Sequence, residues 1–536
     1  MGHAQRLSRR AAVRFLLLAG SAAALSACGP ASPAPTPTSA AAAAGATVVA
    51  TDTPKIGGTL KVLAGGPRIT LATGYDPVGL MNQGARAESL MFEGLTRIQD
   101  DFSIGPQLAE SWTVSPDGQT YTFKIRAGVK FHNGRQMEAA DIKYSIERLK
   151  DPASVSPARL QYGVIDSIDA PDPGTAVFTL KQPYAPLLAL LADDPSSIVP
   201  HEEVEKGSFP MNPVGTGPFK FVSHVVDQQA IFERNPDYWQ PGLPRLDRLE
   251  VTDVLNLQAD FLRFRSGAFD AFQEAPEDQF DTTKAQFPVI VSRGTNWVYF
   301  RMNWDKVPQF KDQRVRQAIG WAIDRQQLGS FSLPTDLVQT NGGSGPLVAW
   351  AAAVEPWVYP NQDLAKAKQL LSDAGVSGLS FEIQTMASVA YLPKSLQVIQ
   401  QMLSSIGVNA TTTVLERAPT AAQIPNIDSY LGGSPGGYDP DNDMTQWFTP
   451  GGPLNYYNYS DDAVTGGVTQ ARSLADQAQR APLYQQAQKQ IAETSNVLFL
   501  YNNAKFDVTA AYVKGWLYPG PAIHRWPEAK QIWLDK

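Results

Sequence analysis

A single cysteine, Cys28, is the feature that most limits how this chain can fold. Without a second thiol, the 536 residues cannot form an internal disulfide or a metal site built from several cysteines. The chain must therefore be stabilised by its core, and large domains bury about 75% of their unfolded surface. Hydrophobic residues make up 43% and charged residues 18%, an ordinary globular balance. At about 150 residues per domain, the length predicts two to four domains.

Residues 1–27 have the layout of an export signal, with a basic start, an apolar run from Phe15 to Ala27 and small residues at the end. The apolar run is shorter than the ~20 residues that span a bilayer. The ending Leu25-Ser26-Ala27-Cys28 resembles a bacterial lipoprotein box. This resemblance implies cleavage before Cys28 and lipidation of Cys28.

The export route stays open between the general secretory and twin-arginine pathways. Ser8-Arg9-Arg10 resembles a twin-arginine signal. Ala12, however, stands where that signal usually has a phenylalanine.

The mature chain is acidic. Removing residues 1–27 takes away four arginines and no acid, which leaves 41 basic against 52 acidic residues and a charge of −11. Such a chain repels phosphate backbones and anionic lipids, so no nucleic acid partner is expected. Membrane attachment is instead expected through the lipid on Cys28.

A low-complexity segment follows the cysteine. From Pro30 to Pro54 the chain is mostly Ala, Pro, Thr and Ser, with no aromatic residue to bury. We predict a flexible tether over residues 28–55.

Strand-like and helix-like patterns alternate along the rest of the chain, which predicts α/β layers. The expected strands are Ile56–Leu63 with its preceding turn, Gln119–Arg126, Thr175–Leu180, Val298–Asn303 and Val497–Tyr501. The expected helices are Ala139–Lys150, Gln313–Leu328, Asp363–Ala374, Leu396–Ile406 and Arg480–Thr494. Asp117-Gly118 predicts a hairpin turn.

Several motifs in a fixed order resemble the family 5 solute-binding proteins of ABC importers, the oligopeptide, dipeptide and nickel group. The resemblance spans about residues 57 to 520. Its motifs are Gly105–Trp112, Gly128–Gly134, Gly215–Phe219, Asn235–Trp239, Val315–Ile319 with Ala322–Arg325, Ala365–Gly375, Tyr484–Ala487 and Lys514-Gly515. Physically, we expect most of these to be structural: the glycines of Gly215–Pro218 to allow positive φ, and Arg316, Asp324 and Arg325 to form a charge network.

The resemblance implies a two-lobed α/β clamshell of the periplasmic-binding-protein type, with an extra domain inserted in lobe one. Lobe one comprises residues 56–95, 206–293 and 505–536, the inserted domain 96–205, and lobe two 294–504. The implied function is an extracytoplasmic, lipid-anchored receptor that captures a small solute between its lobes and delivers it to an ABC permease. It implies a monomer that works with permease and ATPase subunits, uses no cofactor and is not an enzyme.

The same resemblance places the ligand among three segments, Gly65–Gly79, Gly294–Trp304 and Leu431–Phe448. We expect the last to be a loose, glycine-rich recognition loop. The predicted ligand-binding residues offer flat aromatic faces or hydrogen-bonding groups. They are Tyr75, Asn296, Trp297, Asn303, Tyr438, Asp439, Asp441 and Trp447.

One departure from the family pattern bears on the cargo. Peptide binders of the family have an Asp before the tyrosine of the third segment, where it pairs with the peptide ammonium, and Gly437 stands at that position here. A buried ammonium without a counter-charge is costly. Either Asp439 takes over the role, or the cargo is not a free-amine peptide, for instance an oligosaccharide. Family frequency alone favours a peptide.

Two rival interpretations are weaker. Gly432–Gly436 matches the hydrolase pattern G-x-S-x-G around Ser434, but the residues after Gly436 are expected to form a loop rather than the required helix. Asp439, Asp441 and Asp443 copy the start of a calcium loop, although Met444 replaces its glycine. The histidines are scattered, so no metal site is predicted.

Overall fold

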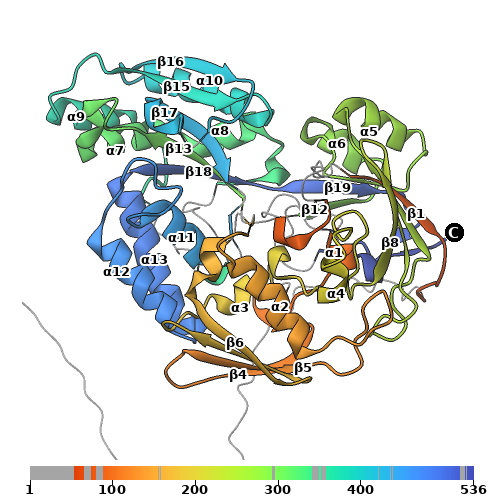
Figure 1. Ribbon diagram of the computed structural model, residues 1–536. Helices are drawn as coiled ribbons and strands as arrows, with labels where there is room; N and C mark the ends of the chain where they lie inside the picture. The colour runs from red at the N-terminus through yellow and green to blue at the C-terminus, as the bar shows by residue number, and fades with distance from the viewer. Residues whose placement is uncertain are drawn as a thin grey trace, which may run out of the picture. The chain divides into compact units, whose positions relative to one another are not determined.

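Three β-sheets organise the part of the chain that the computed structural model describes (Figure 1). The elements belong to one compact unit, Pro54–Lys536. Cys28, Tyr438 and nearly all of the predicted signal and tether lie outside the described residues. Those residues are 53–64, 74–79, 88–99, 101–154, 156, 159–292, 296–340, 349–351, 358–420, 422–434, 436–437, 439–518, 526 and 528–536. None of the described helices combines the length and the apolarity that a membrane span requires.

The first sheet joins strands from the beginning, the middle and the end of the chain. Helices α5 (Leu257–Arg265) and α6 (Phe280–Lys284) pack on one of its faces, and α1 (Glu88–Met91) packs on the other. The strand order is β12 (Val289–Ser292), β19 (Lys505–Thr509), β11 (Ala271–Gln273), β1 (Thr59–Ala64), β10 (Arg248–Asp253), β9 (Gln229–Arg234) and β8 (Phe219–Val225).

The second sheet is covered by helices on both faces, and each face has its own hydrophobic core. Its order is β14 (Val338–Gln339), β18 (Val497–Asn503), β13 (Trp297–Met302), β17 (Ser429–Ser434), β15 (Ser380–Met386) and β16 (Asn409–Leu415). One face carries α7 (Gln313–Ala322), α8 (Arg325–Ser332), α9 (Leu364–Asp373) and α10 (Tyr391–Ser404). The other carries α11 (Pro440–Phe448), α12 (Asp462–Ser473) and α13 (Gln477–Thr494).

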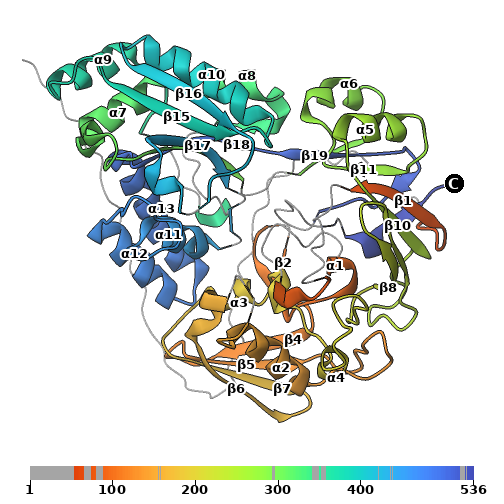
Figure 2. The same ribbon diagram turned by 45° about the horizontal axis from the view of Figure 1, so that its top comes forward.

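The chain passes between these two sheets at two neighbouring points. Strand β12 belongs to the first sheet and β13, the next strand, to the second. Strand β18 of the second sheet continues through Ala504 into β19 of the first, as Figures 1 and 2 show. Because β12 pairs with β19 and β13 pairs with β18, the end of β12 and the start of β13 lie beside the strands that Ala504 joins. We call this region the crossing.

The third sheet, with α2 (Ala139–Lys150), forms a separate core. In β5, Tyr121, Phe123 and Ile125 alternate inward, as their period of two predicts. The strand order is β4 (Ala109–Val114), β5 (Thr120–Ile125), β7 (Thr175–Leu180) and β6 (Ile165–Asp172). The smaller elements are β2 (Thr96–Ile98) with β3 (Ile104–Pro106), β20 (Val513–Lys514) with β21 (Trp533–Leu534), α3 (Leu187–Leu190) and α4 (His201–Val204).

Two expected elements are wrong. The helix predicted over Gln313–Leu328 is broken at Ile323 and Asp324, because Asp324 caps a new helix by accepting a hydrogen bond from the Gln327 amide. The segment predicted as a loose loop over Leu431–Phe448 is the end of β17 followed by α11. Asp439 and Pro440 begin that helix as its N-cap and first residue, a start signal that the high glycine content obscured.

The turn Gly215–Pro218 needs its glycines for a reason other than the expected positive φ. Gly215 and Gly217 are not among the glycines with positive φ. A Cβ on Gly215 would lie 2.0 Å from the Met91 carbonyl oxygen, and one on Gly217 would lie 2.5 Å from the Met91 carbonyl carbon. Close backbone approach therefore excludes any side chain at these two positions.

Arg316 and Arg325 do not form the expected charge network with Asp324. Arg316 donates to the carbonyl oxygens of Phe310 and Thr494 at 2.6 and 2.9 Å. Arg325 donates to the Phe499 carbonyl at 2.8 Å. Both arginines instead tie helix ends and strands together through the backbone, so the expected structural role holds with different partners.

Candidate functional site

The predicted acids at the start of α11 are both paired with arginines. Asp439 accepts a hydrogen bond from the Asp441 amide at 3.0 Å and from Arg480 Nη2 at 2.6 Å. Asp441 lies 3.0 Å from Arg472 Nε. Since all four side chains are at most 20% exposed, each pair is a largely buried ion pair. Neither Asp439 nor Asp441 has a free carboxylate for a ligand cation or for calcium.

A third acid of this helix, Asp443, has no cation beside it among the described residues. Its Oδ2 accepts a hydrogen bond from the Gly437 amide at 2.6 Å, and the residue is 4% exposed. Burial raises the pKa of Asp443 to about 7. The carboxylate thus lies against the backbone of Gly437, the residue that replaces the expected ligand-binding acid.

Gly437 lines a recess between α11 and the segment around α3. The recess has an empty volume of about 390 Å³, part of it open solvent. Its lining residues are Gln161, Tyr184, Pro186, Ala189, Leu190, Asp193, Gly437, Asp439 and Asn442. A backbone hydrogen bond from the Ala185 amide to the Arg472 carbonyl, 2.8 Å long, joins the two sides nearby.

Trp297 and Asn296 lie at the crossing with polar atoms that lack partners. Trp297 is opposite Asn502 of β18 in the sheet, and the Asn502 amide group donates to the Asn296 carbonyl at 2.8 Å. Asn296 Oδ1, Trp297 Nε1 and Asn502 Oδ1 are buried and make no hydrogen bond within the described part of the chain. Buried polar atoms are rarely left unpaired, so such a group marks a place where a ligand or water completes the bonding.

Trp447 packs behind this group. Its ring centroid lies 4.8 Å from that of Trp297 and 4.9 Å from that of Tyr299. Gly432 leaves room for Tyr299, because a Cβ there would lie 2.5 Å from the tyrosine hydroxyl. The structure therefore brings Asn296, Trp297 and Trp447 together, with Trp447 in a core position.

Two predicted site residues lie elsewhere. Asn303 donates to the carbonyl oxygens of Pro425 and Ile427, both at 2.9 Å, and its Oδ1 accepts from the Asp305 amide, so its side chain is fully used. Tyr75 is buried in the core of the first sheet beside Phe221 and His224. Tyr438 lies outside the described residues.

Sequence reasoning gave Asp443, Asn502, Arg472 and Arg480 no part in the site. Asp443 and Trp447 are four residues apart and therefore lie on the same face of α11. Because a loop was expected here, this helical spacing was not recognised in the sequence. The arginines lie 31 and 41 residues from their acids, so no local pattern connects them.

Ser434 ends β17 and is 9% exposed, and α11 begins at Pro440. A strand before and a helix after it are present, contrary to expectation, but five residues separate Ser434 from the helix. Its hydroxyl lies 3.4 Å from the Gly436 amide, and no described histidine forms a hydrogen bond with it.

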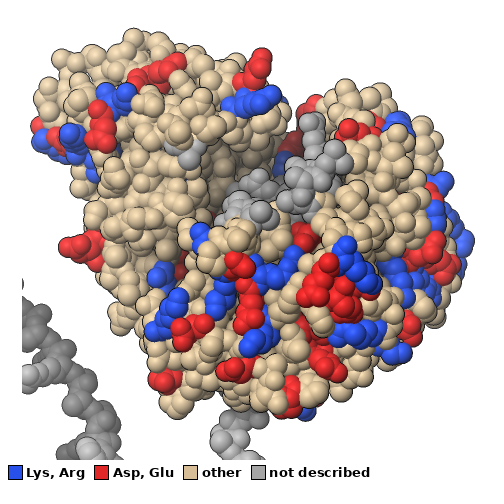
Figure 3. Space-filling model, in the orientation of Figure 1, with Lys and Arg blue, Asp and Glu red and all other residues tan. Residues whose placement is uncertain are grey.

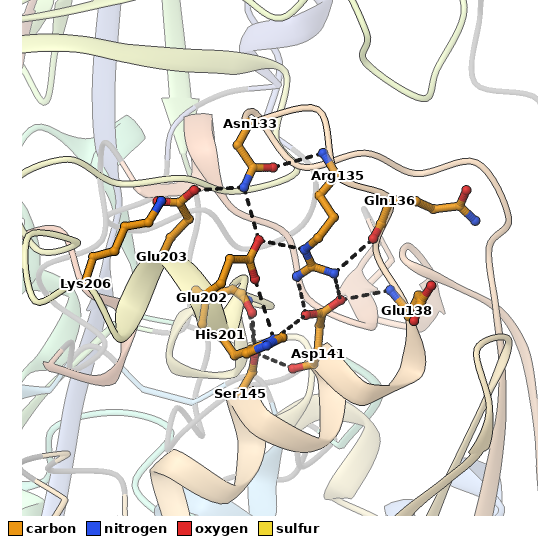
Figure 4. Close-up of polar contacts among 11 residues, drawn as sticks. Asn133, Arg135, Gln136, Glu138, Asp141, Ser145, His201, Glu202, Glu203 and Lys206 are labelled. Carbon is orange, nitrogen blue, oxygen red and sulfur yellow. Dashed lines mark hydrogen bonds and ion pairs between the residues drawn. The ribbon is translucent and has the colours of Figure 1, made fainter.

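Another cluster, Asp141, His201 and Glu202, has the geometry of a metal site, with ligand atoms within 4.8 Å of one another. Arg135 already lies between its acids, 2.5 Å from Asp141 Oδ1 and 2.6 Å from Glu202 Oε1 (Figure 4). A divalent cation there would be repelled by the guanidinium. On the surface around α2 and α4, acidic and basic side chains lie next to one another (Figure 3). The cluster is an ion-pair network.

Comparisons with known proteins agree with this architecture. The family model of bacterial extracellular solute-binding proteins, family 5 Middle, matches residues 103–456. The glutathione-binding protein GsiB of Salmonella typhimurium is 30% identical over 454 residues, which cover 81% of this chain and 87% of that protein. The periplasmic binding protein DppA of Helicobacter pylori, solved with the peptide STSA, is 27% identical with a TM-score of 0.75, covering 90% of this chain and 99% of its own.

One further structure shares the fold. The ABC transporter substrate-binding protein CtaP of Listeria monocytogenes has a TM-score of 0.78 at 21% identity and covers 90% of this chain. The family match extends over two thirds of the sequence, across all three sheets. The chain is therefore a two-lobed α/β protein that belongs to the family 5 extracellular solute-binding proteins of ABC importers.

Proposed function

We propose that this chain captures a small peptide, or another solute with a cationic amine, at the crossing, and delivers it to an ABC permease without catalysing a reaction. The observation that carries the proposal is the group of unpartnered polar atoms on Asn296, Trp297 and Asn502. All three residues lie on or directly before β13 and β18 of the second sheet, next to the strands that lead to the first sheet. A ligand held there favours the closed arrangement of the lobes over the open one once lobe one also contacts it.

Asp443 supports a cationic cargo. Its buried carboxylate has no described counter-ion, and it is held against Gly437, where peptide binders of the family have their acid. An ammonium beside Asp443 would compensate for the cost of burying that charge. The relatives named for glutathione and solved with the peptide STSA are consistent with this cargo class.

An oligosaccharide is the second candidate, because the Asn296 and Asn502 amide groups and Trp297 Nε1 offer hydrogen-bonding groups for its hydroxyls. Sugars are bound through aromatic faces and amide groups and need no buried carboxylate. The two candidates therefore differ in whether Asp443 matters for binding.

The proposal includes four further features that accompany this function. Cys28 carries a lipid that holds the mature chain outside the cytoplasm, and the protein acts as a monomer. The inserted domain comprises residues 96–205, between the first two of the three segments of lobe one. Ser434 takes no part in hydrolysis, because no described base contacts it.

Native mass spectrometry of gently purified protein tests the proposal by identifying the bound solute. The affinity of that solute is then measured for wild type, Trp297→Phe, Asp443→Asn and the control Trp112→Phe, which changes a half-buried tryptophan of the third sheet. We expect Trp297→Phe to weaken binding at least tenfold, or about 1.4 kcal/mol, and the control to leave it unchanged. Equal affinities for all four proteins would refute the proposed site.

A tenfold or greater loss in Asp443→Asn, together with a cationic solute, supports the peptide class. A neutral solute whose affinity is unaffected by Asp443→Asn supports the oligosaccharide. Hydrolysis of any solute by wild type but not by Ser434→Ala would contradict the non-catalytic role.

A further inference from the structure

Arg301 is a buried cation without an acidic partner. The residue is 3% exposed and lies on β13, on the face covered by α11 to α13. Its Nη1 donates to the Leu454 carbonyl at 3.1 Å. Within the described ranges, its Nε and Nη2 make no hydrogen bond and no carboxylate forms an ion pair with it. Because a guanidinium stays protonated in proteins, it cannot relieve burial by losing its proton.

Aromatic rings hold this guanidinium in place. Its central carbon lies 3.6 Å from the ring centroid of Trp447, 4.9 Å from that of Tyr299 and 5.2 Å from that of Tyr456. These cation–π contacts attract the charge but accept no conventional hydrogen bond. The N–H groups of Nε and Nη2 are therefore left for another partner.

Arg301 opens into a recess that is distinct from the one beside Gly437. It has an empty volume of about 290 Å³, part of it open solvent. Two further lining groups, the Tyr457 hydroxyl and Trp447 Nε1, are also buried and find no hydrogen-bond partner in the part of the chain that the structure describes. The side chain of Asn455, which lines the same recess, is already bonded to the carbonyl oxygens of Thr449 and Tyr459 and to the Tyr459 amide.

We propose that this recess binds a small monovalent anion. The unused groups of Arg301, Tyr457 and Trp447 can all donate hydrogen bonds, and a positive charge lies among them, so a compact anion fits them better than a cation. Asp428, the acid whose charge acts on Tyr457, accepts a hydrogen bond from the Glu382 amide and forms no ion pair with Arg301. The limited space and the aromatic lining favour an anion the size of chloride or acetate.

Thermal unfolding of the whole protein at constant ionic strength tests this site. Tm is measured in sodium chloride, in sodium acetate and in sodium gluconate, whose anion is too large for the recess. We expect chloride or acetate to raise Tm by at least 2 °C over gluconate, and the anion that acts identifies the species preferred. Equal Tm values in all three salts would overturn the proposal.

Two variants assign the effect to this recess. Arg301→Met removes the charge and should abolish the difference between the salts. Tyr457→Phe keeps the packing and should weaken the apparent anion affinity at least threefold, which keeps the test valid if Arg301→Met does not fold. The matched control is Arg325→Lys, a buried arginine whose guanidinium is bonded to carbonyl oxygens and which should retain the full anion dependence.

Crystals of the unmodified protein grown with sodium bromide give a direct view. An anomalous bromide peak within hydrogen-bonding distance of Arg301 supports the site. Water alone at Arg301 when bromide is bound elsewhere, or an anion dependence that persists in both Arg301→Met and Tyr457→Phe, would refute it.

Discussion

Asp443 combines a structural cost with a proposed binding role. A carboxyl group whose pKa is raised from 3.8 to about 7 on folding disfavours the folded state once the pH exceeds 3.8. The penalty grows as the pH rises to 7 and then stays constant, at roughly 4 kcal/mol. Groups at binding sites commonly show such an unfavourable balance.

Asp443→Asn should therefore stabilise the free protein at pH 8 by roughly 2 kcal/mol, since the neutral amide removes the charge but must itself be desolvated. At pH 4 most of the carboxylate penalty is absent while the cost of desolvating the amide remains, so the same variant should be roughly 2 kcal/mol less stable than wild type. Urea unfolding at both pH values checks this. A variant that is less stable than wild type at pH 8 would show that the ionised carboxylate is stabilising.

The chemistry of individual residues also explains which candidate site residues could be proposed from the sequence. Asn296 and Trp297 could be proposed because they lie in Gly294–Trp304, a segment where the resemblance places the ligand, and their binding role remains a prediction. Asp439 and Asp441 were predicted as free ligand groups because their arginines, Arg480 and Arg472, come from distant helices. Pairing of charges across long sequence separations depends on the tertiary fold, which local patterns do not encode.

At the scale of elements, the start of α11 depends on α13 through the pair Asp439–Arg480. Arg480→Met should lower the free energy of unfolding by about 3 kcal/mol, because it leaves the Asp439 carboxylate buried and unpaired. The double variant Asp439→Asn/Arg480→Met should recover at least ~1 kcal/mol of that loss. A double-mutant cycle from urea unfolding measures the coupling, and additive losses would contradict it.

The turn before α2 is held by His132. Its Nε2 lies 3.0 Å from the Gly217 carbonyl oxygen, and its Nδ1 lies 3.3 Å from the Gly215 amide nitrogen, so the neutral ring donates through one nitrogen and accepts through the other. Burial lowers the pKa of His132 to about 4. Below pH 6.5 the unfolded chain takes up a proton that the folded chain does not, so stability falls as the pH drops from 6.5 to 4.

This loss should reach about 3 kcal/mol at pH 4. His132→Gln should be less stable than wild type at pH 7 and should lose less stability on acidification over the same window. Chemical denaturation at half-unit steps of pH measures both slopes. Parallel slopes for the two proteins would exclude His132 as the titrating group.

The elements that could be predicted from the sequence are those with a single, clear hydrophobic period. Ala139–Lys150 and Thr175–Leu180 were predicted with the observed bounds, because each pattern is uninterrupted. The helix predicted to begin at Leu396 begins five residues earlier, at Tyr391. Pro393 obscured the first turn of this helix, although proline is tolerated in that position. The prediction of a single helix over Gln313–Leu328 was wrong because α7 and α8, which are separated by a short break, share one apolar period.

For the whole molecule, the two-lobed fold and the family were predicted correctly from motifs in a fixed order. The domain boundaries and the lipid anchor remain predictions. The physical basis of the proposed function is the crossing, where strands of both sheets meet and polar atoms remain unpaired.

Cys28→Ala should release the mature chain from the membrane. Without the thiol no lipid can be attached, and a mature chain with a charge of −11 is repelled by anionic lipids. Fractionation of expressing cells, with detection of the protein in the membrane and soluble fractions, checks this. Equal membrane retention of wild type and variant would contradict lipid anchoring at Cys28.

The crystal structure of the protein with the solute that it retains on purification tests the central claim most directly. We expect polar atoms of the solute within about 3.2 Å of Trp297 Nε1, Asn296 Oδ1 and Asn502 Oδ1. A solute bound away from the crossing, with these three atoms still unpaired, would contradict the account.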